Sequence, residues 1–260
     1  MTLDRFVPKQ KDAFVGYSPA VAVAVAHGLD RLSHWAHVAV EGIERLPPGR
    51  ALLVGNHAFG FDVAFAMARI HAETSRCVWA LGEHAWWAVP VVRRLAAAVG
   101  TVDGTVENVD ALLAADELVL VLPGGLREAM KPRELHYRLL WGHRYGFIRA
   151  AVRNHAPIVP LVSLGADDLF NFVGDAFARA RRWHLPFPLP KPAHLVPVPH
   201  FRSLRFVIGE PIPAEAEGDG EHDEHDEHDE QHVRRLRREV EGAIHERFEV
   251  ELARRAHFCA

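Results

Sequence analysis

Cysteine is scarce in this chain. Only Cys77 and Cys259 occur among 260 residues, and they do not form a Cys-x-x-Cys pair. That pair is the usual sign of a zinc or redox site, and a disulfide framework needs more cysteines than two. The sequence therefore argues against both and predicts a protein of a reducing compartment, the cytoplasm.

Long apolar runs are also missing. The longest one near the N-terminus covers residues 19–26, far short of the roughly 20 apolar residues that a membrane-spanning helix needs. Residues 1–17 are polar and mixed in character, unlike a secretory signal peptide. If the protein meets a membrane, we expect it to lie on the surface, at the inner face.

A large excess of charge of one sign is absent as well. The chain has 30 Lys and Arg against 34 Asp and Glu, whereas nucleic-acid-binding domains usually carry a basic excess. No nucleic acid is therefore expected as a partner. Seven of the acidic residues lie in residues 221–230, and without them the remaining chain is mildly basic, which suits an anionic surface or ligand.

The acidic run repeats Glu-His-Asp and allows two interpretations. His222, His225 and His228 recur every three residues, which would bring them near one face of a helix and suggests a metal site. The low complexity and high charge are instead typical of a solvated linker. We favour the linker and predict no metal site, with a metal-binding protein as the alternative.

The order of elements predicts an α/β fold. Of all residues, 49% are hydrophobic, enough for a sizeable core. Short apolar runs alternate with helical patterns, which is typical of a mixed, largely parallel sheet flanked by helices. Strands are expected at residues 37–40, 51–54, 78–81, 118–122, 158–164 and 206–208, and helices at 18–35, 61–72, 84–98, 107–115, 146–154 and 233–255. The expected organisation is an N-terminal helical segment (1–36), one domain (37–213), an acidic His-rich linker (214–232) and a C-terminal helix (233–260).

The first candidate site is the segment 55–62, between a strand and a helix. Histidine is the usual general base near neutral pH, and His57 is followed five positions later by Asp62. A carboxylate folded back across the turn would accept a hydrogen bond from the imidazole and fix its tautomer. The alternative is an ordinary loop histidine.

The second candidate site is the segment 121–128, which also closes an apolar strand. Carboxyl ends of parallel strands meet at one edge of a sheet, so Gly124 and Gly125 are expected near His57. Their backbone N–H groups would face an oxyanion or a phosphate. Arg127 would bind an anionic group, and Glu128 would pair with Arg127 or face water.

Four blocks together resemble the lysophospholipid/glycerolipid acyltransferase superfamily. The first is Asn56-His57 with Asp62, and the second includes Gly104 and Thr105. The third runs from Pro123 to Glu128 and the fourth over residues 156–161, in the family's order. The resemblance covers roughly residues 37–213. It implies acyl transfer from acyl-CoA or acyl carrier protein to a lipid hydroxyl, directly and without an acyl-enzyme, cofactor or metal.

The resemblance also assigns roles to residues. His57 would be the general base and Asp62 its orienting carboxylate, and the substrate-binding residues would be Asn56, Gly104, Thr105, Gly124, Gly125, Arg127 and Glu128. The third block has Gly124 where the phospholipid-making branch has glutamate, and residues 100–116 lack that branch's arginine. The chain thus looks more like the branch that makes neutral lipids, such as mono- and diacylglycerol acyltransferases.

Other functions stay open from the sequence. A lysophosphatidate acyltransferase, a non-catalytic lipid- or acyl-carrier-binding protein and a thioester hydrolase would each fit the same fold. Two segments are candidates for a peripheral membrane surface, because each combines cations with aromatic residues. They are residues 177–187, and Trp86 and Trp87 with Arg93 and Arg94.

Overall fold

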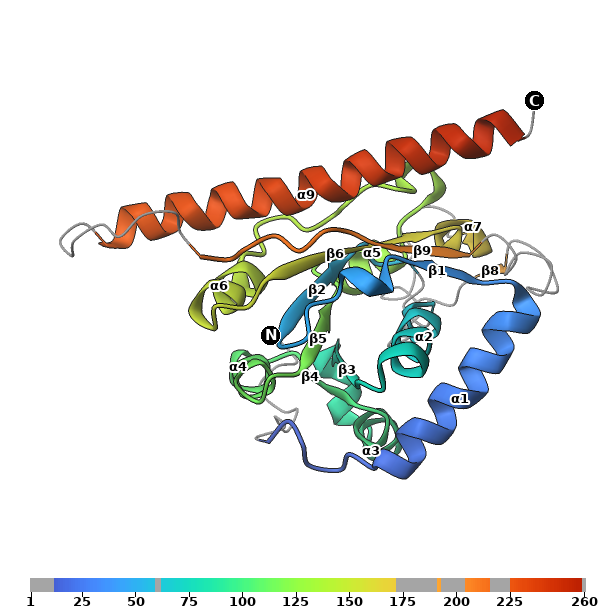
Figure 1. The fold of residues 1–260 in the computed structure, drawn as a ribbon, viewed down its shortest axis with the longest axis horizontal. Helices are drawn as coiled ribbons and strands as arrows, with labels where there is room; N and C mark the ends of the chain where they lie inside the picture. Colours follow the sequence, from blue (N-terminus) through green and yellow to red (C-terminus); the bar gives the residue numbers. More distant parts are fainter. Residues whose placement is uncertain (1–11, 59–61, 172–190, 193–203, 216–224, 259–260) are drawn as a thin grey trace, which may run out of the picture.

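The computed structural model describes residues 12–58, 62–171, 191–192, 204–215 and 225–258. A seven-stranded sheet forms the centre, in the order β1-β9-β6-β2-β5-β3-β4 (Figure 1). Its strands are β1 (Ala39–Glu41), β2 (Ala51–Gly55), β3 (Val78–Gly82), β4 (Thr101–Asp103), β5 (Leu118–Val121), β6 (Ile158–Leu164) and β9 (Arg205–Ile208). A separate pair joins β7 (Phe170–Asn171) to β8 (Lys191–Pro192).

Most of the sheet is parallel. Strands β6, β2, β5, β3 and β4 run in one direction, while β9 pairs with β6 in the opposite direction and β1 runs parallel to β9. The carboxyl ends of the parallel strands therefore share one edge, which is where open α/β sheets place their sites. This confirms the predicted mixed, largely parallel α/β fold.

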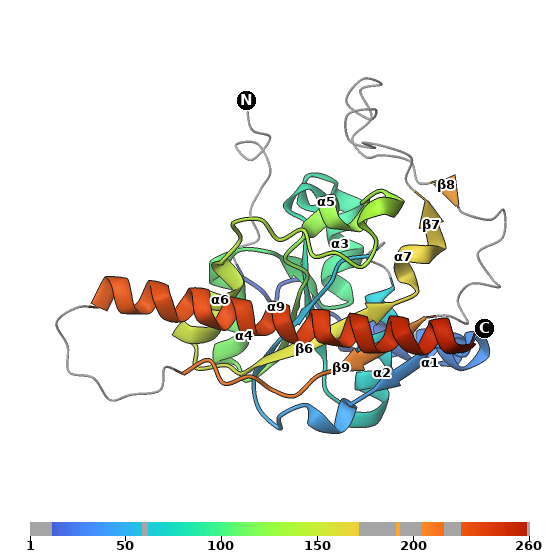
Figure 2. The same ribbon diagram turned by 90° about the horizontal axis from the view of Figure 1, so that it is seen from above.

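Helices cover both faces of the sheet. Figure 1 shows α9 along one face, with α1 and α2 on the other, and Figure 2 shows α9 crossing the whole width of the domain. The α-helices are α1 (Pro19–Ala36), α2 (Val63–Thr74), α3 (Pro90–Ala98), α4 (Val106–Ala114), α5 (Gly125–Ala129), α6 (Gly146–Arg153), α7 (Ala166–Leu169) and α9 (His225–Phe258). Short 3-10 turns are η2 (Ile43–Arg45), η3 (His84–Ala88) and η4 (Arg133–Leu135).

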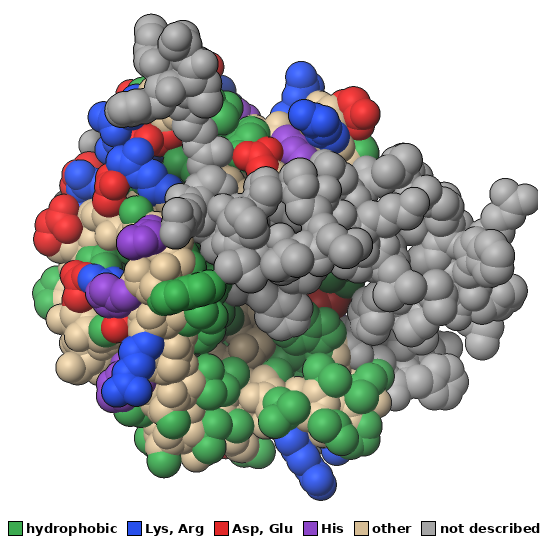
Figure 3. Space-filling model, turned by 90° about the vertical axis from the view of Figure 1, so that its right-hand side faces the viewer, with side chains coloured by type: hydrophobic (Ala, Val, Ile, Leu, Met, Phe, Trp, Pro, Cys, Tyr) green, Lys and Arg blue, Asp and Glu red, His purple; other side chains and the backbone are tan. Residues whose placement is uncertain are grey.

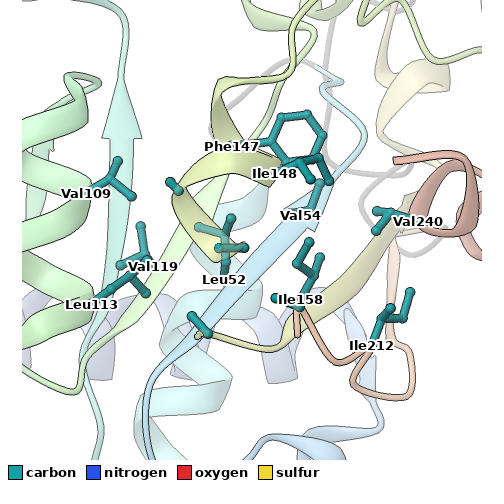
Figure 4. Close-up of a cluster of buried hydrophobic side chains, with 14 of the residues drawn as sticks. Leu52, Val54, Val109, Leu113, Val119, Phe147, Ile148, Ile158, Ile212 and Val240 are labelled. Carbon is teal, nitrogen blue, oxygen red and sulfur yellow. The ribbon is translucent and has the colours of Figure 1, made fainter. Parts of the chain in front are cut away.

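Two hydrophobic clusters, one on each face, hold these layers together. Side chains alternate along a strand, so Leu52 and Val54 of β2 pack toward α4, α6 and α9 (Figure 4), while Ala51 and Leu53 pack toward α2. All of β2 and β6 is buried, which explains why these central strands read as continuous apolar runs.

The long helix α9 buries one stripe against the sheet. Its buried residues recur at helical spacing, namely Val233, Leu236, Val240, Ile244 and Phe248. The helix begins at His225, inside the segment 214–232 that we expected to be a linker. On its first described turns Glu230 forms an ion pair with Arg149 of α6.

Local differences from the expected elements have simple causes. The helix expected over residues 84–98 is divided into η3 and α3 at Val89 and Pro90, because proline lacks an N–H and restricts the residue before it. The strand β4 and the short helix α5 were not anticipated. Both are too short to show a hydrophobic period.

Two other predictions from the sequence concern membrane-spanning helices and metal sites. In the part of the chain that the structure describes, no helix is long and apolar enough to cross a membrane. No metal-binding cluster of His, Cys, Asp and Glu occurs among the described residues either. His222 lies outside them, so the interpretation of the Glu-His-Asp run stays a prediction.

Candidate active site

His57 lies directly beyond the carboxyl end of β2. Its backbone N–H donates to Glu128 Oε1 at 2.6 Å, and its ring Nδ1 lies 2.7 Å from the carbonyl oxygen of Ala58. A carbonyl oxygen only accepts, so Nδ1 carries the proton in this geometry. The other ring nitrogen, Nε2, then holds the lone pair that a general base requires.

The surroundings keep the His57 ring neutral. Burial lowers its pKa to about 4, because desolvation disfavours the charged form. The hydrogen bond to Ala58 opposes this shift, and so does the negative charge of Asp167; the cations Lys131 and Arg144 add to it. At neutral pH, His57 is therefore in the form that accepts a proton.

Asn56 and Asp62, on either side of His57, are both fixed to Ser163 of β6. The Asn56 side chain donates to the Ser163 carbonyl at 3.0 Å and accepts from its N–H at 2.8 Å. The Ser163 hydroxyl donates to Asp62 Oδ2 at 2.6 Å. All three residues are buried. Through these hydrogen bonds Ser163 holds Asn56, just before His57, and Asp62, just before α2. The Asn56 amide donates once and accepts once in this contact, and its expected substrate-binding role stays a prediction.

The direct pairing of His57 with Asp62 remains a prediction. Residues 59–61 between them lie outside the described part of the chain. Asp62 is almost entirely buried and precedes α2, so its carboxylate stands at the helix N-terminus, where negative charge is favourable.

The buried side chain of Glu128 holds the backbone of the His57 turn in place. Its side chain is completely buried, Oε1 accepts the His57 N–H, and Oε2 accepts the Leu140 N–H at 2.6 Å. Burial raises the pKa of this carboxyl, while the charge of Lys131 and the two N–H donors oppose the rise. Neither expected environment for Glu128 is observed: it does not face water, and its two oxygens bind backbone N–H groups rather than Arg127.

Gly124 is required by the position of Glu128. A Cβ added at Gly124 would lie 2.1 Å from Glu128 Oε2 and 2.3 Å from its Cβ, far inside van der Waals contact. Because Gly124 has no side chain, the Glu128 carboxylate has room to lie against its backbone. Gly125 has a positive φ of 56°, and its N–H donates to the carbonyl of Leu122. That N–H is thus occupied, unlike the oxyanion donor expected from the sequence.

Three cations lie near the turn. Lys131 is buried and forms an ion pair with Asp167 of α7 at 3.0 Å. Arg144 donates to the carbonyl of Pro123, and its guanidinium lies 3.0 Å from the place a Gly125 Cβ would take. Arg127 is exposed on α5. Arg127 and Arg144 are thus exposed cations on the described segments next to the turn, well suited to an anionic group on a substrate.

The second block lies at the ends of β3 and β4. The Thr105 hydroxyl accepts from the Asn108 N–H and caps α4, and the Gly104 N–H donates to the Gly82 carbonyl. Next to them, His84 Nδ1 lies 2.9 Å from Oδ2 and 3.0 Å from Oδ1 of Asp103. Thr105 and Gly104 thus serve the local structure, and the polar pair His84–Asp103 is a feature the sequence did not indicate.

Sequence reasoning missed several residues of this site. Ser163 is the one polar residue in the run Ile158–Leu164, and a lone hydroxyl in a fully buried strand was a usable signal, since buried polar groups need partners. Lys131, Arg144 and His84 had no such signal, because their positions depend on tertiary contacts.

The chain is similar in sequence to several known proteins. Residues 37–164 match the family model described as Acyltransferase. An uncharacterized protein of Mycobacterium tuberculosis (strain ATCC 25618 / H37Rv) is 34% identical over 211 residues, which cover 76% of this chain and 58% of that protein. The mouse protein named "DGAT1/2-independent enzyme synthesizing storage lipids" is 29% identical over 189 residues, covering 69% of this chain and 54% of its own length.

A solved structure is also similar. It is the crystal structure of the 1-acyl-sn-glycerophosphate acyltransferase PlsC from Thermotoga maritima, with a TM-score of 0.49 and 16% identity over 87% of this chain and 79% of that one. The chain spans a little over half the length of the two protein relatives named above. Its candidate base His57 lies inside the stretch matched by the family model. Over residues 37–164, the chain is thus similar to the acyltransferase family.

Proposed function

We propose that this protein transfers a fatty acyl group from a thioester to the hydroxyl of a lipid alcohol, with His57 as the general base. The observation that carries the proposal is the state of the His57 ring: Nδ1 is held by the Ala58 carbonyl, and the ring is neutral at working pH. This leaves Nε2 to take the proton of an attacking hydroxyl.

The reaction is a direct transfer. As the acceptor oxygen attacks the thioester carbonyl, its proton moves to His57 Nε2, and the thiolate leaves and is then protonated. Asp62, held by Ser163 at the N-terminus of α2, is proposed to stabilise the imidazolium that forms. Because Glu128 binds the His57 N–H at 2.6 Å, the base is fixed in place before the substrates arrive.

A neutral glycerolipid is the proposed acceptor. Residues 100–116 contain no arginine, and a buried phosphate without a cation is costly. The name of the mouse relative refers to storage lipids, which points the same way. The exposed Arg127 and Arg144 beside Gly125 favour an anionic acyl donor, acyl-CoA or acyl carrier protein. They also support the second candidate acceptor, lysophosphatidate.

The test is the turnover of labelled acyl-CoA and acyl carrier protein with four acceptors: lysophosphatidate, monoacylglycerol, diacylglycerol and a long-chain alcohol. Loss of a general base typically costs 10²–10⁴-fold, so His57→Ala is expected to reduce ester formation by that factor. The matched control is His245→Ala, on the exposed side of α9, which should retain activity. Ester formation at the wild-type rate in His57→Ala would refute the mechanism, and release of free fatty acid alone would indicate a hydrolase.

A peripheral membrane surface is proposed on α1 and α3. No residue of α3 is buried, and Val91 and Leu95 are 65% and 66% exposed. On the first turns of α1, Val21 and Val25 are 44% and 41% exposed, and the Ser18 N–H binds the Ala98 carbonyl, so this end of α1 adjoins α3. Figure 3 shows hydrophobic side chains over the lower part of this face.

This surface differs from the two segments considered from the sequence. Trp87 is only 4% exposed, so it belongs to the core rather than to an interface. Residues 177–187 lie outside the described part of the chain. The cations Arg93 and Arg94 remain part of the proposal, because α3 carries them among its exposed apolar residues, as a helix lying on anionic lipid would.

A further inference from the structure

A buried cation next to the candidate site, Lys131, has no role in the chemistry described so far. Its side chain is 1% exposed, and its ammonium lies 3.0 Å from Oδ2 of Asp167. Among the residues that the structure describes, no acceptor is aligned for a hydrogen bond from this ammonium, so it acts on its neighbours through its charge. A buried charge is costly unless opposite charges compensate it. The carboxylates around Lys131 therefore show what the buried charge does.

Glu128 is the second carboxylate that this charge affects. The Lys131 backbone N–H donates to the Glu128 carbonyl at 3.2 Å, so the two residues lie one turn apart at the end of α5. Burial raises the pKa of the Glu128 carboxyl, and the charge of Lys131 opposes this rise more than either N–H donor does. The charge of Asp167 adds to the rise, with the smallest effect of these groups. Lys131 is thus a cation that favours the ionised form of Glu128.

The ionised form is the one that fits the two hydrogen bonds of Glu128. Oε1 accepts the His57 N–H and Oε2 accepts the Leu140 N–H, both at 2.6 Å. An ionised carboxylate accepts on both oxygens, whereas protonation turns one of them into a donor. A proton on either oxygen would therefore compete with a backbone N–H for the same contact. Protonation of Glu128 is expected to release the backbone of His57 or that of Leu140.

We propose that Lys131 is a positioning residue of the candidate active site: its ammonium keeps Glu128 ionised, and the ionised Glu128 holds the backbone of His57. This assignment rests on the proposed acyl transfer, in which His57 is the base to be aligned. Lys131 itself meets no substrate, because its ammonium is sealed from solvent. The ion pair with Asp167 attaches the lysine to α7 and so fixes the place of its charge.

The first measurement needs no substrate. It is an NMR titration of protein labelled at the carboxyl carbons of its glutamate side chains, with Glu128→Gln to assign the Glu128 signal. In Lys131→Met the titration midpoint of Glu128 should move to higher pH, because the opposite charge is gone. The control Arg153→Met breaks a half-exposed ion pair with Asp110 of α4 and should leave the midpoint in place. An unmoved midpoint in Lys131→Met would overturn the inference, whether or not the protein transfers acyl groups.

The second measurement is the pH profile of kcat for acyl transfer. In Lys131→Met the fall of kcat at acid pH should begin roughly one pH unit higher than in wild type, the usual effect of losing a nearby opposite charge. In a Glu128→Gln background the same substitution should shift nothing, because the carboxyl through which Lys131 acts is absent. An equal loss of kcat at every pH would mean a merely structural role and would overturn the inference. So would a shift that persists in the Glu128→Gln background.

A further variant keeps the test decisive if Lys131→Met does not fold with Asp167 unpaired. The double variant Lys131→Met, Asp167→Asn removes both charges of the ion pair, a change that buried pairs often tolerate. Because Lys131 affects Glu128 more strongly than Asp167 does, both shifts should still be upward in pH. Downward or absent shifts would overturn the inference. A wild type with the expected Glu128 titration that acylates no acceptor would instead refute the proposed function.

Discussion

The neutral state of His57 can be tested without any substrate, through the dependence of stability on pH. Its pKa is about 4 in the folded protein against 6.5 for an ordinary histidine. Between these two values the unfolded chain binds a proton that the folded protein does not. The contribution of His57 to stability is therefore fully present above pH 6.5 and is lost as the pH falls through about 4.

The magnitude follows from the size of the shift. Each pKa unit corresponds to 1.36 kcal/mol, so the shift of His57 amounts to about 3 kcal/mol of unfolding free energy between neutral pH and pH 4. Carboxylates such as Glu128 titrate in the same interval. The effect must therefore be read as a difference between the wild type and a variant that lacks only this imidazole.

The assay is urea unfolding of the wild type and His57→Gln at half-unit steps from pH 7 to pH 4. The stability advantage of the wild type over the variant should fall by about 3 kcal/mol across this interval. The control His245→Ala, an exposed histidine on α9, should show a constant difference from wild type. A constant difference for His57→Gln as well, or an NMR titration giving His57 a pKa near 6.5, would refute the neutral-base argument.

Three more predictions concern Glu128, Ser163 and the exposed residues of α3. Glu128→Gln gives an amide that cannot accept from both N–H partners, so urea unfolding should show a loss of about 1–3 kcal/mol and kcat should fall; wild-type values for both would contradict this. Ser163→Ala removes the hydroxyl that holds the carboxylate before α2, which should lower kcat more than it raises KM, and a change in KM alone would argue against it. The double variant Val91→Glu, Leu95→Glu should reduce cosedimentation with anionic vesicles at least tenfold, about 1.4 kcal/mol, whereas the control Val250→Glu, exposed on α9, should bind normally.

Much of the fold was predictable because the central strands are buried on both faces. The run Ile158–Leu164 is a strand with the expected bounds, and the apolar run at 51–54 is extended by one residue in β2. A continuous run of branched apolar residues between turn signals gives this result. Among the elements that were missed, β4 and α5 are three and five residues long, so they carry almost no periodic information.

The site was less predictable than the fold. His57 was found because its residue type and its position after a strand both indicate chemistry. The role of Glu128 was not predictable, since its two acceptor contacts join it to His57 and to Leu140, residues far from it or in irregular structure. The partners of Ser163 were hidden for the same reason, since it meets Asn56 and Asp62 only when β6 pairs beside β2.

The two contacts of Glu128 also link two segments that lie apart in the sequence. One oxygen accepts the backbone N–H of His57, and the other accepts that of Leu140, in the segment that leads to Arg144. Moving either segment away from the other would leave a buried carboxylate oxygen without its donor. The backbone of His57 and the segment before Arg144 are therefore expected to keep a fixed distance from each other.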